Sequence, residues 1–179
     1  MLEDTEIIAL VKSGNTDAFA EIIERYKSPV FRYLYRLTNN YDIAQDIMQD
    51  TFIQAFQGLS RTEMKVSFKS WLYRIATNNV LMVWRRRKIL FFVPLKEELR
   101  APEGISEDQS ASIGIQMDIQ NILARIPSKQ RVCMVLHFVE GFKYKEIAAS
   151  LGISEEAVRK RVTRGSQEFK RLYNSEEVG

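Results

Sequence analysis

Hydrophobic positions recur at three- and four-residue steps along most of the chain, which is the spacing that gathers side chains on one face of an α-helix. The clearest case follows Ser154, where steps of four, three, four and three connect Val158, Val162, Gly165, Phe169 and Leu172. Only 8 glycines and 4 prolines interrupt 179 residues. The pattern therefore predicts an all-α protein.

Capping residues and helix breakers divide the first half of the chain. They predict helices over Glu6–Lys12, from Thr16 to Thr38 with a break or kink at Pro29, from an N-cap at Asp42 to Gln57, and from a cap at Ser67 to about Arg87. In the last of these, the apolar stripe places four residues toward the core: Phe68, Trp71, Leu72 and Ile75.

The composition changes between Pro94 and Ser112, where prolines, serines and acids gather. Such a segment is typical of a flexible linker. Helical patterns resume over 117–126, 128–140 and 145–151, and again from 154. We therefore expect two small helical domains, 1–88 and 117–175, joined by a flexible acidic linker at 89–116.

The stretch GFKYKEIAASLGISEEAVRKRVTRG predicts a helix-turn-helix, because Gly152 permits a sharp turn between two amphipathic helices. In that motif the second helix enters the major groove of DNA. Opposite its apolar stripe lie Arg159, Lys160, Thr163, Arg164, Gln167, Lys170 and Arg171, with Arg161 on the shoulder beside the core. Arginine and lysine donate to guanine edges and to phosphates. A solvated basic face is the ordinary alternative.

Charge is also segregated in the first half. Asp42, Asp46 and Asp50 follow at four-residue spacing, whereas Arg61–Lys88 contains eight basic residues and one acid. The candidates for nucleic-acid contact are Lys65 in the loop Ser60–Ser67, then Lys69, Tyr73, Arg74, Thr77 and Asn78 on the helix face away from the core, and Arg85 at the start of a basic tract.

Metal chemistry is the alternative for two groups. Aspartates can hold Mg²⁺ for phosphoryl chemistry, but helical carboxylates at this spacing are more often a solvated or partner-binding face. Cys133 and His137 offer two zinc ligands without a second pair to complete the site. We expect no metal, no cofactor and no catalysis.

Composition limits the cellular context. The net charge of +3 is modest, and the one cysteine forms no disulfide within the chain, which fits a reducing cytosol. The longest apolar run, at 89–93, is too short to span a bilayer. We expect a cytoplasmic protein that does not insert into a membrane.

Four motifs occur together in order: DAFAEIIERY, DIAQDIMQDTFIQAF, FKSWLYRIATN and IPSKQRVCMVLHFVEGFKYKEIAASLGISEEAVRKRVTRG. With them the chain resembles an extracytoplasmic-function sigma factor, the minimal class of the bacterial primary sigma family. The resemblance implies binding to core RNA polymerase, recognition of the −10 and −35 promoter elements, and assistance in promoter opening. It also implies an anti-sigma factor as a partner. A self-sufficient operator-binding regulator is the rival interpretation, and it would need a second recognition helix from a dimer.

The resemblance assigns residues to each contact. The coiled coil of the polymerase largest subunit would meet Asp46, Gln49, Asp50 and Phe52. The −10 element would meet Lys65, Lys69, Tyr73, Arg74, Asn78 and Arg85. The −35 element would meet Arg159, Lys160, Arg161, Thr163 and Arg164. Three features depart from the family pattern: residues 80–83 (VLMV) stand where members commonly have an acid, Gly165 replaces the usual alanine, and the run ILFFVPL is unusually apolar. We expect that run to pack on the first domain or to be covered by an anti-sigma factor.

Overall fold

The computed structural model of the chain describes residues 2–64, 66–90 and 119–177, and within these ranges all regular secondary structure is helical. The first half contains α1 (Asp4–Lys12), η1 (Thr16–Ala18), α2 (Phe19–Thr38), α3 (Tyr41–Leu59) and α4 (Phe68–Leu90). The second half contains helical residues 119–125, then α6 (Ser128–Met134), η3 (Val135–Val139), α7 (Tyr144–Leu151) and α8 (Glu155–Glu177). The prediction of an all-α fold is confirmed.

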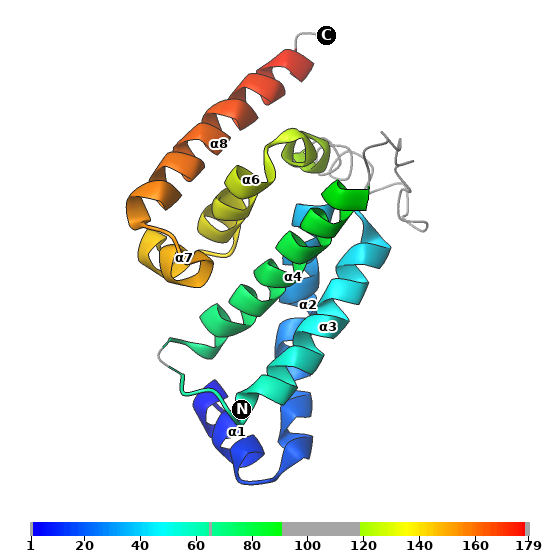
Figure 1. Cartoon of the computed structure of the whole chain (residues 1–179), viewed down its shortest axis with the longest axis vertical. Helices are drawn as coiled ribbons and strands as arrows, with labels where there is room; N and C mark the ends of the chain where they lie inside the picture. Colours follow the sequence, from blue (N-terminus) through cyan, green and yellow to red (C-terminus); the bar gives the residue numbers. More distant parts are fainter. Residues whose placement is uncertain (1, 65, 91–118, 178–179) are drawn as a thin grey trace, which may run out of the picture.

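The helices α2, α3 and α4 lie side by side, and α1 crosses one end of them (Figure 1). They enclose a core that includes Ile22, Leu34, Leu37, Ile47, Ala55, Leu59, Leu72 and Val80. Polar groups within this core are paired: the hydroxyls of Tyr33 and Thr77 are 2.7 Å apart, and the Asn79 amide donates to Thr51 Oγ1 (3.3 Å). No buried side-chain nitrogen or oxygen within the described ranges lacks a hydrogen-bond partner.

Two helix boundaries differ from the sequence prediction. The N-cap of α3 is Asn40, whose Oδ1 accepts from the Ile43 amide (2.9 Å), and Asp42 instead lies in the first turn, where a negative charge favours the helix dipole. The predicted break at Pro29 is wrong, because α2 runs through this residue as one helix. Burial of one α2 face on both sides of Pro29 outweighs the single backbone hydrogen bond that proline removes.

Two predicted caps are confirmed. Ser67 Oγ accepts from the Ser70 amide at the start of α4 (3.2 Å), and Ser154 Oγ accepts from the Ala157 amide at the start of α8 (3.1 Å). Each cap satisfies a backbone donor that the first turn of a helix leaves unpaired. Gly152 has φ 64° at the C-cap of α7, as the predicted sharp turn requires.

The helix predicted over residues 128–140 changes character halfway. After α6, residues Val135–Val139 form a π-helical turn, η3, in which the Glu140 amide donates to Val135 O (3.1 Å). Such turns contain one extra residue relative to an α-helical turn and are often found at functional sites. The chain then reverses at Gly141 (φ 77°) before α7.

Gly165 allows α8 to approach α6 closely. A Cβ atom at this position would overlap Met134 Sδ and would lie 2.9 Å from Met134 Cγ. The absence of a side chain at Gly165 therefore permits the close packing of α8 on α6.

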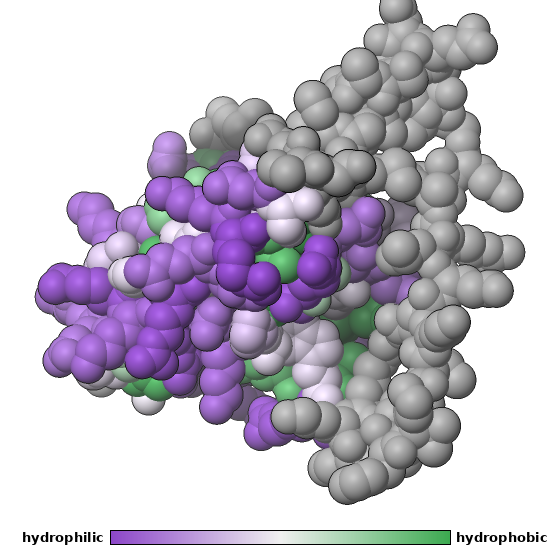
Figure 2. Space-filling model, turned by 90° about the horizontal axis from the view of Figure 1, so that it is seen from above, coloured by the Kyte–Doolittle hydropathy of each residue, from purple (hydrophilic) through white to green (hydrophobic). Residues whose placement is uncertain are grey.

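The second group of helices packs on the first through α7 against α4, with α6 and η3 near α2 (Figure 1). Seen from above, the described surface is mostly hydrophilic, with small hydrophobic areas between (Figure 2). Lys65 and the predicted linker, including most of the ILFFVPL run, fall outside the described residues.

Candidate nucleic-acid and polymerase interfaces

The helix α8 separates its faces as predicted. Val158, Val162 and Leu172 are buried, whereas Arg159, Lys160, Thr163, Arg164 and Gln167 are exposed. The Arg159 guanidinium lies 5.8 Å from the centre of the Tyr144 ring, and Lys160 pairs with Glu156 (2.7 Å) on the open surface. Exposed pairs of this kind contribute little stability, so both cations are available to a partner.

Arg161 is placed differently from its neighbours. It is half-buried and hydrogen-bonded to Cys133, where it partly offsets the rise that burial causes in the pKa of that thiol. Arg161 therefore lies at the edge of the core, as its shoulder position predicts. Among the five residues expected at the −35 element, it is the least accessible.

The helix α3 presents an acidic surface that also carries apolar side chains. Asp42, Asp46, Gln49 and Asp50 are exposed. Ile53 and Phe56, which the sequence pattern assigns equally well to packing, are also exposed. Aromatic and aliphatic side chains within a charged surface are typical of a protein interface. These two residues were missed as site candidates, although their spacing after Gln49 would have indicated them.

Phe52 is not part of this surface. It is only 7 % exposed and lies on the buried stripe of α3 with Ala44, Ala55 and Leu59. Phe52 is therefore buried in this structure, and its expected role as a direct polymerase contact stays a prediction. Its stripe faces the neighbouring helices, and the side chain contributes to the core that holds the surface in place.

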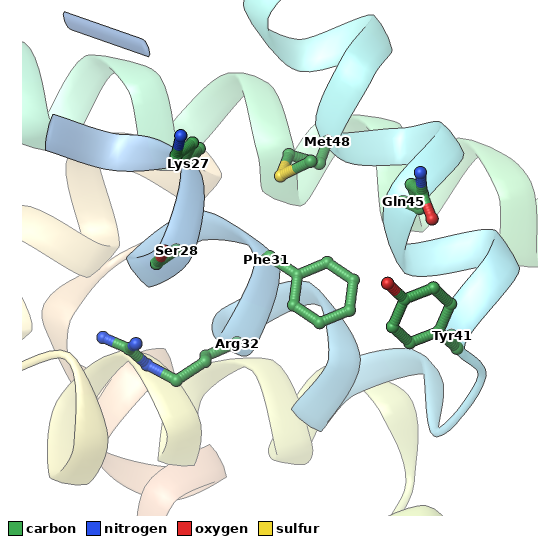
Figure 3. Close-up of a pocket in the computed structure, with 7 residues that line it drawn as sticks. All are labelled: Lys27, Ser28, Phe31, Arg32, Tyr41, Gln45 and Met48. Atoms are coloured by element: carbon green, nitrogen blue, oxygen red, sulfur yellow. The ribbon is translucent and has the colours of Figure 1, made fainter. Parts of the chain in front are cut away.

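A shallow pocket of about 360 Å³ lies between α2 and α3, next to the acidic surface (Figure 3). The rings of Phe31 and Tyr41 meet there edge to face, with centroids 5.1 Å apart. Lys27, Ser28, Arg32, Gln45 and Met48 complete its lining. The pocket combines ring faces with cations, and the sequence pattern did not predict it.

An apolar groove of about 340 Å³ runs along the second group of helices, between residue 119 and α8. Its walls include Leu123, Met134 and Phe169, and its rim includes Phe138, which is 62 % exposed. The sequence pattern does not predict this groove, because the exposure of Phe138 and Val139 follows from the π-helical turn.

On α4, the predicted contact residues do not form one open surface. Arg74, Asn78 and Arg85 are exposed, but Tyr73 is 2 % exposed and Thr77 is buried. The prediction that all of them face outward is therefore wrong. Two elements cover the intervening face: α2, through the Tyr33 ring against Tyr73 (5.0 Å), and the segment after η3.

The segment after η3 contacts two further candidates on α4, Lys69 and Tyr73. The Tyr73 hydroxyl donates to Glu140 Oε2 (2.8 Å), and Lys69 Nζ donates to the carbonyl oxygen of Glu140 (3.0 Å). Burial raises the pKa of Tyr73, and the adjacent Glu140 carboxylate raises it further. The phenol therefore remains protonated and can donate at any physiological pH.

Three further observations concern metal binding and membrane insertion. In the parts of the chain that the structure describes, no three His, Cys, Asp or Glu residues are grouped closely enough to hold a metal ion. His137 Nδ1 lies 3.0 Å from the carbonyl oxygen of Phe142, and Cys133 is buried. None of the helices within the described ranges combines the length and the apolar character needed to cross a membrane.

Comparison with known proteins gives two family matches: Sigma-70 region 2 over residues 22–89 and Sigma-70 region 4 over residues 116–168. The ECF RNA polymerase sigma factor SigW of Bacillus subtilis is 31% identical over 176 residues, covering 92% of this chain and 93% of that protein. The ECF sigma factor SigE of Mycolicibacterium smegmatis is 33% identical over 157 residues, covering 84% of this chain and 59% of that protein.

Two solved structures share the fold. CnrH in complex with the cytosolic domain of CnrY has a TM-score of 0.73 at 23% identity, covering 96% of this chain and 97% of that one. The sigma factor RpoE in complex with the anti-sigma factor NepR, from Bartonella quintana, has a TM-score of 0.69 at 23% identity, covering 87% and 96%.

Proposed function

We propose that this chain, which belongs to the ECF RNA polymerase sigma factors, directs core polymerase to promoters that have a −10 and a −35 element. Residues 1–88 would bind polymerase and the −10 element, and residues 117–175 the −35 element. The observation that carries the proposal is the exposed basic face of α8, which follows a glycine turn and lies opposite a buried stripe. This arrangement suits insertion of α8 into the major groove.

Each side chain on that face has a definable task. Arg159 and Arg164 can donate two hydrogen bonds to a guanine edge, which distinguishes base pairs. Lys160 suits phosphate, because an ammonium is a point charge without a fixed fork. Thr163 can contact either a base edge or a thymine methyl group. We propose that these four residues read the −35 element.

The polymerase contact is proposed for the exposed side of α3. Asp46, Gln49 and Asp50 supply charge and hydrogen bonds, and Ile53 and Phe56 supply apolar area beside them. Phe56 is supported from below by Phe19, with ring centroids 5.1 Å apart. A pre-positioned aromatic side chain loses little conformational freedom on binding.

At the −10 element we propose contacts from Arg74, Asn78 and Arg85, joined by Lys69 and Tyr73. The free energy of binding the opened strand would offset unstacking, which costs a few kcal/mol per step. The chain itself catalyses nothing in this scheme and works in the cytoplasm. RpoE of Bartonella quintana was solved with an anti-sigma factor, and we propose a partner of the same kind here.

Run-off transcription tests the proposal. Wild-type protein is added to sigma-free bacterial core polymerase on promoter fragments from its own genome, alongside Asp50→Lys and the control Asp17→Lys. Both variants make the same charge change at an exposed residue, but Asp17 lies in η1 and is not part of α3. We expect specific transcripts with wild type and Asp17→Lys, and none with Asp50→Lys.

The absence of transcripts with wild type, together with tight duplex binding by the protein alone, would overturn the proposal in favour of an operator-binding regulator. Equal loss with both variants would show that the effect comes from net charge and not from the α3 surface. Circular dichroism of Asp50→Lys establishes that the variant is folded.

A further inference from the structure

The two groups of helices are joined by a cluster of contacts around Glu140. Its carboxylate accepts from the Tyr73 hydroxyl (2.8 Å) and lies 3.9 Å from the Arg36 guanidinium, and its backbone carbonyl accepts from Lys69 Nζ (3.0 Å). The Glu140 side chain is only 10 % exposed. A carboxylate removed from water to this degree depends on these partners.

Phe142 lies two residues further along and contacts the same face of α4. Its ring centroid is 5.2 Å from that of Tyr73 and 5.0 Å from Lys69 Nζ. Phe142 is itself buried. One short segment therefore presents a carboxylate to the Tyr73 hydroxyl, a backbone carbonyl oxygen to Lys69 Nζ, and a flat ring to both of these α4 side chains.

A nucleotide likewise presents an anion, its phosphate, and a flat ring, its base. Lysine and tyrosine donate to phosphate oxygens in protein–DNA complexes, and aromatic rings receive unstacked bases. Lys69 and Tyr73 are two of the residues proposed for the −10 element. In this structure both are occupied by the chain's own Glu140 and Phe142.

A second set of contacts, at the C-terminal end of α2, holds the same arrangement. The Arg131 guanidinium donates to Leu37 O (2.6 Å) and lies 5.5 Å from the Trp84 ring centre, and Gln120 Nε2 donates to Tyr35 O (2.8 Å). Burial lowers the pKa of Arg131 to about 10, so the group remains charged at neutral pH. The Glu140 cluster therefore belongs to an extended interface.

We propose that the segment Glu140–Phe142 is an internal substitute for the promoter strand, which occupies the −10 face of α4 in the free chain and must be displaced before DNA binds there. The proposal rests on the proposed function. An intramolecular competitor acts at high effective concentration, so the free chain's affinity for DNA is reduced by the fraction of molecules in which the face is open. Separation of the two groups of helices on polymerase would remove the competitor.

The test compares Glu140→Gln with Glu24→Gln in the free, full-length chain. Both changes remove one negative charge, but Glu24 is exposed and pairs with Lys27 on the surface of α2. Binding of a fluorescein-labelled oligothymidylate is followed by anisotropy at one fixed salt concentration, because such affinities depend on salt. We expect Glu140→Gln to bind about fivefold more tightly than wild type, since a charge-assisted hydrogen bond is roughly twice as strong as a neutral one.

A measurement of the distance between α2 and α8 tests whether tighter DNA binding comes from separation of the two groups of helices. Ala20→Cys and Asn174→Cys introduce exposed labelling sites on α2 and α8, and Cys133 is buried away from reagent. We expect energy transfer between dyes at these sites to fall in the Glu140→Gln background and to stay unchanged with Glu24→Gln. Unchanged transfer and unchanged affinity would overturn the proposal, and so would lower transfer without tighter DNA binding.

Arg36→Gln provides an independent variant in case Glu140→Gln does not fold. Arg36 reaches the Glu140 carboxylate from α2 and has no proposed DNA contact. We expect about a twofold rise in DNA affinity, although the variant loses a positive charge, and no rise would count against the proposal. Run-off transcription by the wild-type chain tests the sigma function separately, so failure of either proposal is recognisable without the other.

Discussion

Gly165→Ala is expected to destabilise the protein, although alanine favours helix. The substitution gains about 1 kcal/mol of helix propensity in the interior of α8. The new Cβ would overlap Met134 Sδ and would lie 2.9 Å from Met134 Cγ and 3.3 Å from Gln130 Cβ. The Met134 thioether can rotate, but Gln130 Cβ is fixed to the α6 backbone. The two helices must therefore separate, and overpacking of this kind costs about 1–3 kcal/mol. We expect a net loss of about 1 kcal/mol.

Urea unfolding followed by circular dichroism measures this loss, with Gly58→Ala as the matched control. Gly58 also lies within a helix, α3, but a Cβ there would meet Trp71 at an ordinary 3.4 Å. We expect Gly58→Ala to stabilise the protein by about 0.5 kcal/mol. Met134→Ala, added to Gly165→Ala, removes the overlapping atoms, so the two changes should couple by about 1 kcal/mol.

If Gly165→Ala stabilised the protein as Gly58→Ala is expected to do, overlap with Met134 and Gln130 would not limit the approach of α8 to α6. Additive effects of Gly165→Ala and Met134→Ala would likewise show that the α6–α8 contact does not require glycine.

Three further predictions concern α8 and its surroundings. Arg164→Ala should cost the holoenzyme about 1–3 kcal/mol at its matching −35 duplex and less at other sequences, measured by competition binding, whereas Arg171→Ala should cost less because that residue is held by Glu168. Ser154→Ala should lower the free energy of unfolding by about 1 kcal/mol in urea, because it removes the N-cap of α8. Burial raises the pKa of the Cys133 thiol above its ordinary value of 9.0, so disulfide reagents at pH 8 should modify it far more slowly in native than in urea-unfolded protein. Above pH 9 the unfolded state loses this proton first, so the free energy of unfolding should fall as pH rises.

Local signals predicted the helices well, because capping and periodicity act within a few residues. Ser67 and Ser154 cap the helices that follow them, and Gly152 makes the turn that its position indicated. The N-cap of α3 is Asn40 and not the predicted Asp42. Either side chain can accept a hydrogen bond from a backbone amide of the first turn, so only the backbone geometry decides which residue is the cap. Boundaries of this kind are set by differences too small for a pattern to resolve.

The predicted exposure of side chains was wrong where distant segments cover a face. Periodicity placed Tyr73 opposite the core stripe of its own helix, but its partner Glu140 lies 67 positions away in the chain. Phe52 was assigned by resemblance, and its burial follows from how α3 packs on its neighbours. The periodicity of apolar residues along a helix identifies one buried face, whereas other segments of the chain cover α4 on two faces.

The π-helical turn at Val135–Val139 also limits how the length of this protein can change. At about 100° per residue, deleting one residue there would let an ordinary α-helix continue, but would rotate everything after it by that angle. Glu140 and Phe142 would then no longer face α4, and α7 and α8 would be redirected with them. Substitutions within the turn leave the direction of the chain intact, whereas a single-codon deletion changes the direction in which the entire helix-turn-helix end of the molecule points.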